Sequence, residues 1–211
     1  MPDLLLALVF FPMIAGPFGY WLGQKYSKAR DTFVLAAVVL ESMMVVTIWT
    51  SGPMSTSLEG FCALGIRFSS GDFQTLMAVL TASGWLAATI FCREYMVHVH
   101  RQNRFYLFWL MTLGATMGVF LSADLFTTFI FFEIMSFTSF VAVIQTEEPQ
   151  AIEAGGTYLA VAVIGGLAAL SGLFLLYHTL GTLSLDAMGA AAAAVEDKTM
   201  LWVGGILVLV G

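Results

Sequence analysis

The residue best placed to do chemistry is Glu133, an acid near the middle of a run of apolar side chains. An acidic residue at the centre of a bilayer costs about 2.5 to 3.5 kcal/mol on insertion scales, so we expect Glu133 to face other helices and to have a cationic or water partner. A carboxyl whose protonation follows the movement of a nearby cation is what a proton relay requires. Ser136, one turn further on, is placed to hold a water beside it. The alternative is that Glu133 forms a structural hydrogen bond to a neighbouring helix.

Glu41 lies at a similar depth in an earlier apolar run, between Leu40 and Met43. The same depth argument applies, and both a part in the relay and a structural hydrogen bond stay open for it. Asp124, nine residues before Glu133, points to the opposite side of a helix at 100° per residue. Its place at a helix start favours an N-cap over a second relay carboxylate.

Two further patterns have structural explanations. Gly114, Gly118 and Ser122 recur every four residues and form a small-residue stripe that lets another helix pack closely. His98 and His100 lack cysteine or carboxylate companions at ligand spacing, which favours a solvated basic loop over a metal site. The sequence contains no nucleophile elbow, phosphate-binding glycine loop or haem motif, so we expect no catalytic residue, metal or cofactor in this chain.

The elements that position these residues follow from composition. Hydrophobic residues make up 59% of the 211 residues and charged residues only 10%, and the mean hydropathy of +0.90 is far above that of a water-soluble domain. The net charge of −6 argues against nucleic acid as a partner, because no basic stripe is available to neutralise phosphates. We therefore expect residues 1–211 to form a single all-α integral membrane domain, with lipid and other membrane subunits as partners.

Apolar runs predict about six full transmembrane helices and a partial seventh. The expected spans are residues 4–23, 32–50, 74–92, 106–121, 124–144, 155–177 and the incomplete 200–211. Between the second and third spans, Ile66 and Phe68 alternate with Arg67 ahead of Ser70 and Gly71, which predicts a short external strand or hairpin. The last run reaches only about 18 Å at 1.5 Å per residue, so we expect either a longer protein or a partner that completes this helix.

Basic residues cluster at 24–31, between the first two spans, and at 93–104, between the third and fourth. The positive-inside rule places both loops in the cytoplasm and the N-terminus outside. The expected location is the cytoplasmic (inner) membrane of a prokaryote. The first apolar run lacks a basic n-region and a cleavage site, which favours a retained helix over a signal peptide. Cys62 and Cys92 then lie on opposite sides of the membrane, which disfavours a disulfide between them.

Six short motifs between residues 65 and 183 form a recognisable set. They are Gly71-Asp72-Phe73, Arg93-Glu94-Tyr95, Leu121-Ser122-Ala123-Asp124-Leu125, Phe132-Glu133-Ile134-Met135-Ser136, Thr157-Tyr158-Leu159 and Gly181-Thr182-Leu183. Together they resemble the N-terminal part of the antiporter-like subunits shared by respiratory complex I, energy-converting hydrogenases and Mrp-type cation/proton antiporters.

This resemblance implies a larger helical fold in which a glutamate on the fifth helix pairs with a lysine on the seventh, the pair switching during ion transfer. Glu133 matches that glutamate. The matching lysine would lie a few residues beyond Gly211, and no family motif matches Glu41 or the histidines.

Three functions follow as hypotheses. The first is proton or sodium translocation within a redox-driven complex of the complex I or membrane-bound hydrogenase type, whose iron–sulfur clusters, with nickel–iron as a further option, would belong to partner subunits. This chain would then be a subunit of an oxidoreductase without being catalytic alone. The second is a subunit of a multisubunit Na+/H+ antiporter without redox chemistry, and the third is a non-conducting scaffold.

Overall fold

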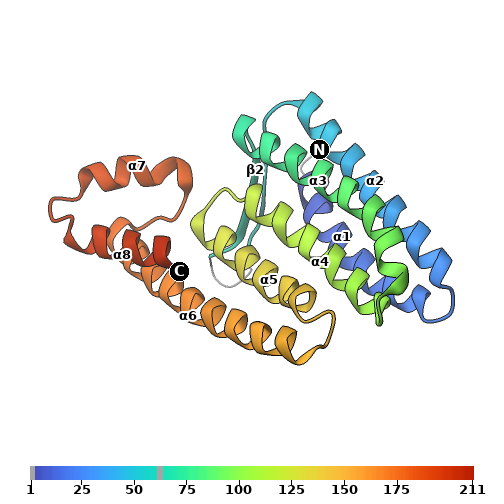
Figure 1. Cartoon of the computed structure of the whole chain (residues 1–211). Coiled ribbons are helices and arrows are strands. Elements are labelled where there is room, and N and C mark those ends of the chain that lie inside the picture. Colours follow the sequence, from blue (N-terminus) through green and yellow to red (C-terminus); the bar gives the residue numbers. More distant parts are fainter. Residues whose placement is uncertain (1–2, 61–63) are drawn as a thin grey trace.

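Eight helices and one β-hairpin make up the computed structural model, which describes residues 3–60 and 64–211 (Figure 1). The helices are α1 (Asp3–Gly23), α2 (Ser27–Ser51), α3 (Asp72–Tyr95), α4 (Gln102–Phe120), α5 (Leu125–Val143), α6 (Pro149–Leu180), α7 (Leu185–Ala194) and α8 (Thr199–Val210), with a short 3-10 turn at Met96–His98. Five of them, α1, α2, α3, α5 and α6, are long and apolar enough to cross a membrane. The chain is therefore an all-α membrane protein.

Helix α4 lies at the centre of the bundle. It packs against α1, α3 and α5, while α2 packs between α1 and α3. Its side chains Leu110, Leu113 and Met117 are fully buried. At 19 residues α4 is as long as α5, but its first turn holds Gln102, Asn103 and Arg104, which lower its mean hydropathy. Packing against α1, α3 and α5 therefore shields α4 from its surroundings, although its own sequence is less apolar than that of α5.

Small residues bring α4 close to two neighbours. A Cβ built on Gly114 would lie 2.5 Å from the Val9 carbonyl oxygen of α1, so the two backbones are in contact there. One built on Gly118 would overlap the Phe131 ring of α5. Ser122 donates from Oγ to the Gly118 carbonyl at 2.6 Å. The stripe therefore serves two interfaces at successive turns, one with α1 and one with α5.

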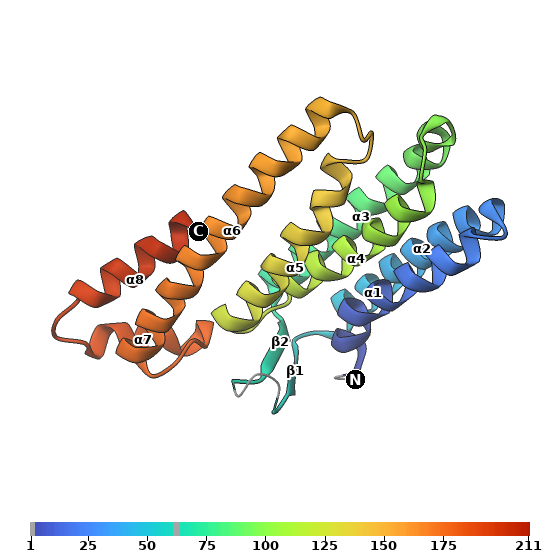
Figure 2. The same cartoon turned by 90° about the horizontal axis from the view of Figure 1, so that it is seen from below.

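Strands β1 (Met54–Leu58) and β2 (Ile66–Ser70) form an antiparallel pair between α2 and α3. Met54 lies opposite Ser70, and Leu58 lies opposite Ile66. Figure 2 shows the hairpin at the same end of the bundle as the N-terminus, while the α1–α2 and α5–α6 connections lie at the other end. The alternation at Ile66–Phe68 thus corresponds to β2, and of the two expected alternatives, a strand or a hairpin, the structure has the hairpin.

The hairpin is joined to two other connections by backbone hydrogen bonds. Ser69 N–H donates to the Leu121 carbonyl at 2.8 Å, and Ala123 N–H donates to the Arg67 carbonyl at 2.9 Å. Two more bonds, of 3.0 and 3.1 Å, join the α4–α5 connection to the segment 183–185 between α6 and α7. Three segments that are far apart in sequence therefore meet at this end of the protein.

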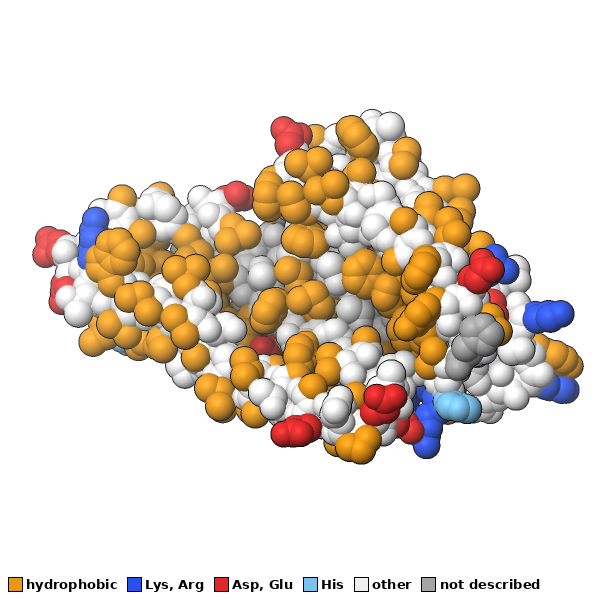
Figure 3. All heavy atoms as spheres, in the orientation of Figure 1, with side chains coloured by type: hydrophobic (Ala, Val, Ile, Leu, Met, Phe, Trp, Pro, Cys, Tyr) orange, Lys and Arg blue, Asp and Glu red, His pale blue; other side chains and the backbone are white. Residues whose placement is uncertain are grey.

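Apolar side chains cover most of the molecular face in Figure 3, and charged side chains gather mainly towards its margins. Exposed hydrophobic residues occur on α1, α2, α3, α5 and α6, among them Ile14, Leu80, Ile164 and Phe174. A surface of this kind is suited to lipid or to other membrane subunits, and not to water.

Arg30 differs from the expected place in a basic loop at 24–31. Helix α2 already begins at Ser27, and Arg30 is only 2% exposed. Its guanidinium hydrogen-bonds to Asp31, Gln102 and Asn103, and it lies 4.9 Å from the centroid of the Tyr106 ring. These contacts satisfy the charge, so the side chain joins α2 to α4 instead of facing water.

Two further differences concern the second half of the chain. Helix α6 begins at Pro149, whereas residues 145–153 were expected to form a loop. Proline suits the first helical position, where no N–H partner is needed. Residues 185–194, which lie outside every expected span, form α7, a ten-residue helix with no buried residue.

Candidate ion-translocation site

Glu133 lies at the interface between α5 and α6, where its carboxyl faces a glycine. A Cβ built on Gly166 of α6 would lie 2.6 Å from Glu133 Oε1 and 2.7 Å from Oε2. The carboxyl therefore occupies the space that a side chain at position 166 would fill. The placement agrees with the expectation that Glu133 faces another helix, and it brings in Gly166, which the sequence analysis did not single out.

Polar groups continue along the same interface. Tyr158 Oη of α6 lies 2.8 Å from Ser139 Oγ and donates to the Ser136 carbonyl at 3.1 Å. Ser136 thus contributes its backbone oxygen to a cluster about one turn from Glu133. Tyr158 belongs to the Thr157-Tyr158-Leu159 motif, so the sequence held a signal for it, but the motif alone gave no reason to place it near Glu133.

The end of α8 reaches the same level of α6. A Cβ built on Gly165, the residue before Gly166, would lie 2.9 Å from the Gly211 carbonyl oxygen. Beside it, a hollow of about 360 Å³ is lined by residues of α5 and α6 together with Val208 to Gly211. Whatever follows Gly211 in a longer chain therefore starts close to the helix face that Glu133 contacts.

No cation pairs with Glu133 among the residues that the structure describes. The ion pairs among the described residues join Arg30 to Asp31, and Arg101 and Arg104 to Glu147. The arrangement offers a half-buried acid, a glycine that leaves room for it, and a polar cluster nearby. It lacks, within the described residues, the positive charge that a switching pair requires.

Glu41 is separate from this site. It lies on the buried face of α2 between Val38 and Val45 and is 0% exposed. Neither carboxylate oxygen has a hydrogen-bond partner among the described residues. No hydrogen bond joins it to another predicted site residue in the described part of the chain, and its role stays a prediction.

Asp124 has the capping role expected of it. Its Oδ1 accepts from Thr127 N–H at 2.8 Å, and its Oδ2 accepts from Thr127 Oγ1 at 2.8 Å. Near α8, hydrogen bonds from the side chain and the backbone of Thr199 lower the pKa of Asp197, which is fully exposed. Both acids therefore stabilise helix starts.

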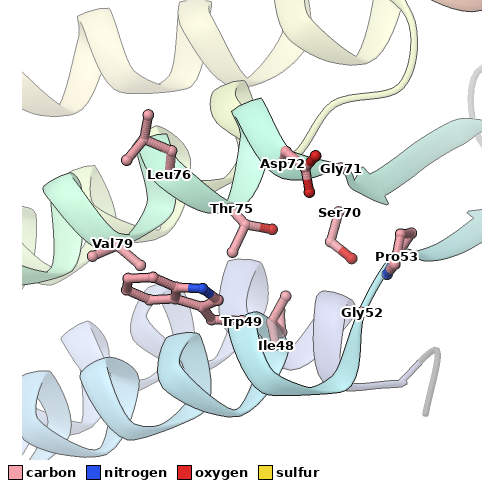
Figure 4. A pocket seen from close by; sticks show the side chains of 10 residues that line it. All are labelled: Ile48, Trp49, Gly52, Pro53, Ser70, Gly71, Asp72, Thr75, Leu76 and Val79. Carbon is pink, nitrogen blue, oxygen red and sulfur yellow. The ribbon is translucent and has the colours of Figure 1, made fainter.

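No group of three or more potential metal ligands occurs in the portion of the chain that the structure describes. Cys92 is half-buried in α3, and Cys62 lies outside the described residues. A cavity of about 240 Å³ lies between the end of α2 and the start of α3, where Trp49 and Val79 come from facing helices (Figure 4). Asp72 is the single charged residue in its described lining, so the cavity adds no second acid to the site.

Comparison with known proteins places these features in a family. Residues 122–211 match the family described as "NADH:quinone oxidoreductase/Mrp antiporter, TM". Glu133, Ser136, Tyr158 and Gly166 all fall within that segment.

Relatives of known name span the chain more widely. An Alkalihalophilus pseudofirmus protein, named as a subunit of a Na(+)/H(+) antiporter, is 23% identical over 100% of this chain and 43% of its own length. A Staphylococcus aureus protein named as antiporter subunit mnhD2 is 31% identical over 70% of this chain and 30% of its own length. The chain thus spans less than half of the length of these relatives.

Two solved structures share the fold. A chain of the archaeal membrane-bound sulfane sulfur reductase, a respiratory membrane complex, superimposes with a TM-score of 0.83 at 22% identity, over 97% of this chain and 43% of that one. A chain of the Mrp complex from Dietzia sp. DQ12-45-1b gives 0.84 at 17% identity, over 98% of this chain and 23% of that one. Residues 122–211 therefore belong to the NADH:quinone oxidoreductase/Mrp antiporter family, and the chain as a whole is similar to antiporter-like membrane subunits.

Proposed function

We propose that this chain takes part in exchanging protons for sodium ions as a subunit of a multisubunit Mrp-type antiporter, and that Glu133 is its proton-carrying group. The observation that carries the proposal is the Glu133 carboxyl set against Gly166, inside the membrane-crossing part of the bundle. An ionisable group at that depth is costly and is usually retained for ion transfer.

The cationic partner of Glu133 would come from the segment that follows α8 in the longer relatives. The Gly211 carbonyl against Gly165 supports this assignment, because a continuing chain emerges one residue along α6 from the Glu133 contact.

The names of the curated relatives favour an antiporter over a redox-driven complex, which the sequence analysis had placed first. Both relatives above are named as antiporter subunits, whereas the sulfane sulfur reductase shares the fold at low identity. Iron or nickel in the purified native complex would instead favour the redox-driven complex, with those metals held by partner subunits.

The test is ion exchange by the assembled complex in proteoliposomes, followed by a pH-sensitive dye after a sodium pulse. Glu133→Gln should lower the rate by about 100-fold, the scale expected when a positioned acid–base group is removed. Glu133→Asp should retain part of the rate. Glu153→Gln, an exposed acid near the start of α6, serves as the control and should behave as wild type. Wild-type exchange by an assembled Glu133→Gln complex would favour the scaffold instead.

A further inference from the structure

A hollow of about 510 Å³ opens at the end of the bundle opposite the hairpin. It is lined by Tyr20 of α1 and, from the start of α4, by Arg101, Asn103, Arg104, Leu107 and Phe108. The lining is graded, because the polar residues belong to the first turn of α4 and the two apolar residues lie one turn deeper. One end of the hollow is suited to a charged group and the other to hydrocarbon.

Positive charge is in excess at the polar end. Arg101 Nε lies 3.2 Å from Glu147 Oε2, and Arg104 Nη1 donates to Glu147 Oε1 at 2.5 Å. One carboxylate therefore serves two guanidinium groups, which leaves about one net positive charge. A guanidinium has five N–H donors, and Arg104 uses one on Glu147 and a second, at 3.5 Å, on Gln145. Its Nε is buried without an acceptor among the described residues.

The two turns that present this ion pair are strained. Arg101 has φ 57° and Glu147 has φ 58°, and in the described parts of the chain they are the two residues other than glycine with positive φ. Left-handed backbone is unfavourable for such residues and persists where the surroundings hold it. Arg101 ends the α3–α4 connection and Glu147 lies in the α5–α6 connection, so two separate turns adopt an unfavourable conformation around one ion pair.

The position along the bundle matches the interface between membrane and water. Trp21 and Tyr26 are exposed at the same end, next to Lys25. Aromatic and basic side chains gather in this way at the level of lipid headgroups. The hollow therefore opens where a phosphate lies in a bilayer, with its apolar floor on the hydrocarbon side.

We propose that this hollow binds the headgroup of an acidic phospholipid, with the lipid phosphate against Arg101 and Arg104 and an acyl chain against Leu107 and Phe108. Arginine binds phosphate through paired N–H groups, and basic pockets between membrane helices select anionic headgroups. The site lies at the far end of α4 and α5 from Asp124 and does not depend on the function proposed for Glu133.

The test counts lipids retained by the purified, assembled complex in native mass spectrometry after exchange into phosphatidylglycerol or phosphatidylcholine. Arg101→Gln combined with Arg104→Gln should lower phosphatidylglycerol occupancy by about 30-fold, from roughly 1 kcal/mol per basic residue. Phosphatidylcholine retention should not change. The matched control is Lys25→Gln with Lys28→Gln, which removes the same charge at the same end outside the hollow and should retain phosphatidylglycerol. An equal loss in the control would overturn the site in favour of general surface attraction.

A second variant tests the site independently, in case the double mutant fails to fold. Phe108→Trp enlarges a side chain on the apolar floor and leaves both arginines and Glu147 in place, so it should lower lipid occupancy while the complex still assembles. Unchanged phosphatidylglycerol retention in both variants would overturn the proposal. So would displacement of the lipid by inorganic phosphate at equal concentration, which would identify a free-anion site, or a cross-link from position 104 to an acidic residue of another subunit.

Discussion

At the scale of single residues, the contact between Glu133 and Gly166 joins chemistry to packing. The glycine leaves room for a carboxyl that would otherwise have to turn away from α6. Further along the same interface, Ser139 and Tyr158 supply hydroxyl groups. The absence of a side chain at position 166 of α6 thus positions the acid as much as its own helix α5 does.

Gly166→Ala should therefore impair ion exchange although it removes no polar group. The new methyl group would lie 2.6 Å from Glu133 Oε1, so the carboxyl must move, and displacement of a reacting group by about 1 Å can cost up to about 100-fold in rate. Gly156→Ala on the same helix meets nothing within 4 Å and is the matched control. The measurement is the sodium-pulse assay with assembled complex. Equal rates in the two variants would show that the carboxyl does not need this space.

At the scale of elements, close packing of α4 determines how the first five helices fit together. Its glycines face α1 at one turn and α5 at the next, so α4 holds both neighbours at short distance. Arg30 adds a polar contact from α2 at the other end of the helix. Because of these contacts, we expect substitutions in α4 to disturb the packing of more helices than substitutions in any other element.

Gly118→Ala should lower the stability of the protein by about 1 to 3 kcal/mol, the usual cost of overpacking. The added methyl would overlap the Phe131 ring, which is itself 1% exposed and cannot move without displacing α5. Gly84→Ala on α3, where a Cβ meets nothing within 4 Å, is the control and should be neutral or slightly stabilising. Thermal unfolding of the complex in nanodiscs, followed by loss of assembly, distinguishes the two. A fall of equal size for Gly84→Ala would contradict the packing argument.

The sequence predicted the long helices because their apolar runs are unmistakable, but it placed their ends less well. Helix α6 begins before its apolar run, since Pro149 starts a helix that extends through polar residues. Helix α7 was missed because a ten-residue alanine-rich segment has no period that marks a buried face. For the site, depth alone identified Glu133, whereas the contact of Glu133 with Gly166 and that of Ser139 with Tyr158 form only when α5 and α6 pack. No local pattern contains those contacts.

At the scale of the whole molecule, the two ends of the bundle differ in character. Basic and aromatic residues gather where α1 meets α2 and α3 meets α4, and the hairpin occupies the opposite end with the N-terminus (Figure 2). From the positive-inside rule we predict that the hairpin lies outside the cell.

Cysteine labelling of cells tests this orientation. In a variant with Cys62 and Cys92 replaced by serine, Ser57→Cys in β1 should react with a membrane-impermeant maleimide added to intact cells. Lys25→Cys should react only after permeabilisation. Both positions are exposed, so differences in labelling report the side of the membrane and not burial. The opposite pattern would reverse the orientation.

Helices α5 and α6 are joined at both ends. Hydrogen bonds connect the start of α5 to the segment 183–185 that follows α6, and the short connection 144–148 joins the two helices at the opposite end. Glu133 lies about 12 Å along α5 from its first residue, between the two joints. Two helices fixed at both ends can separate at the middle only by bending, so we expect ion transfer at Glu133 to rely on movement of its side chain and not on sliding of α5 past α6.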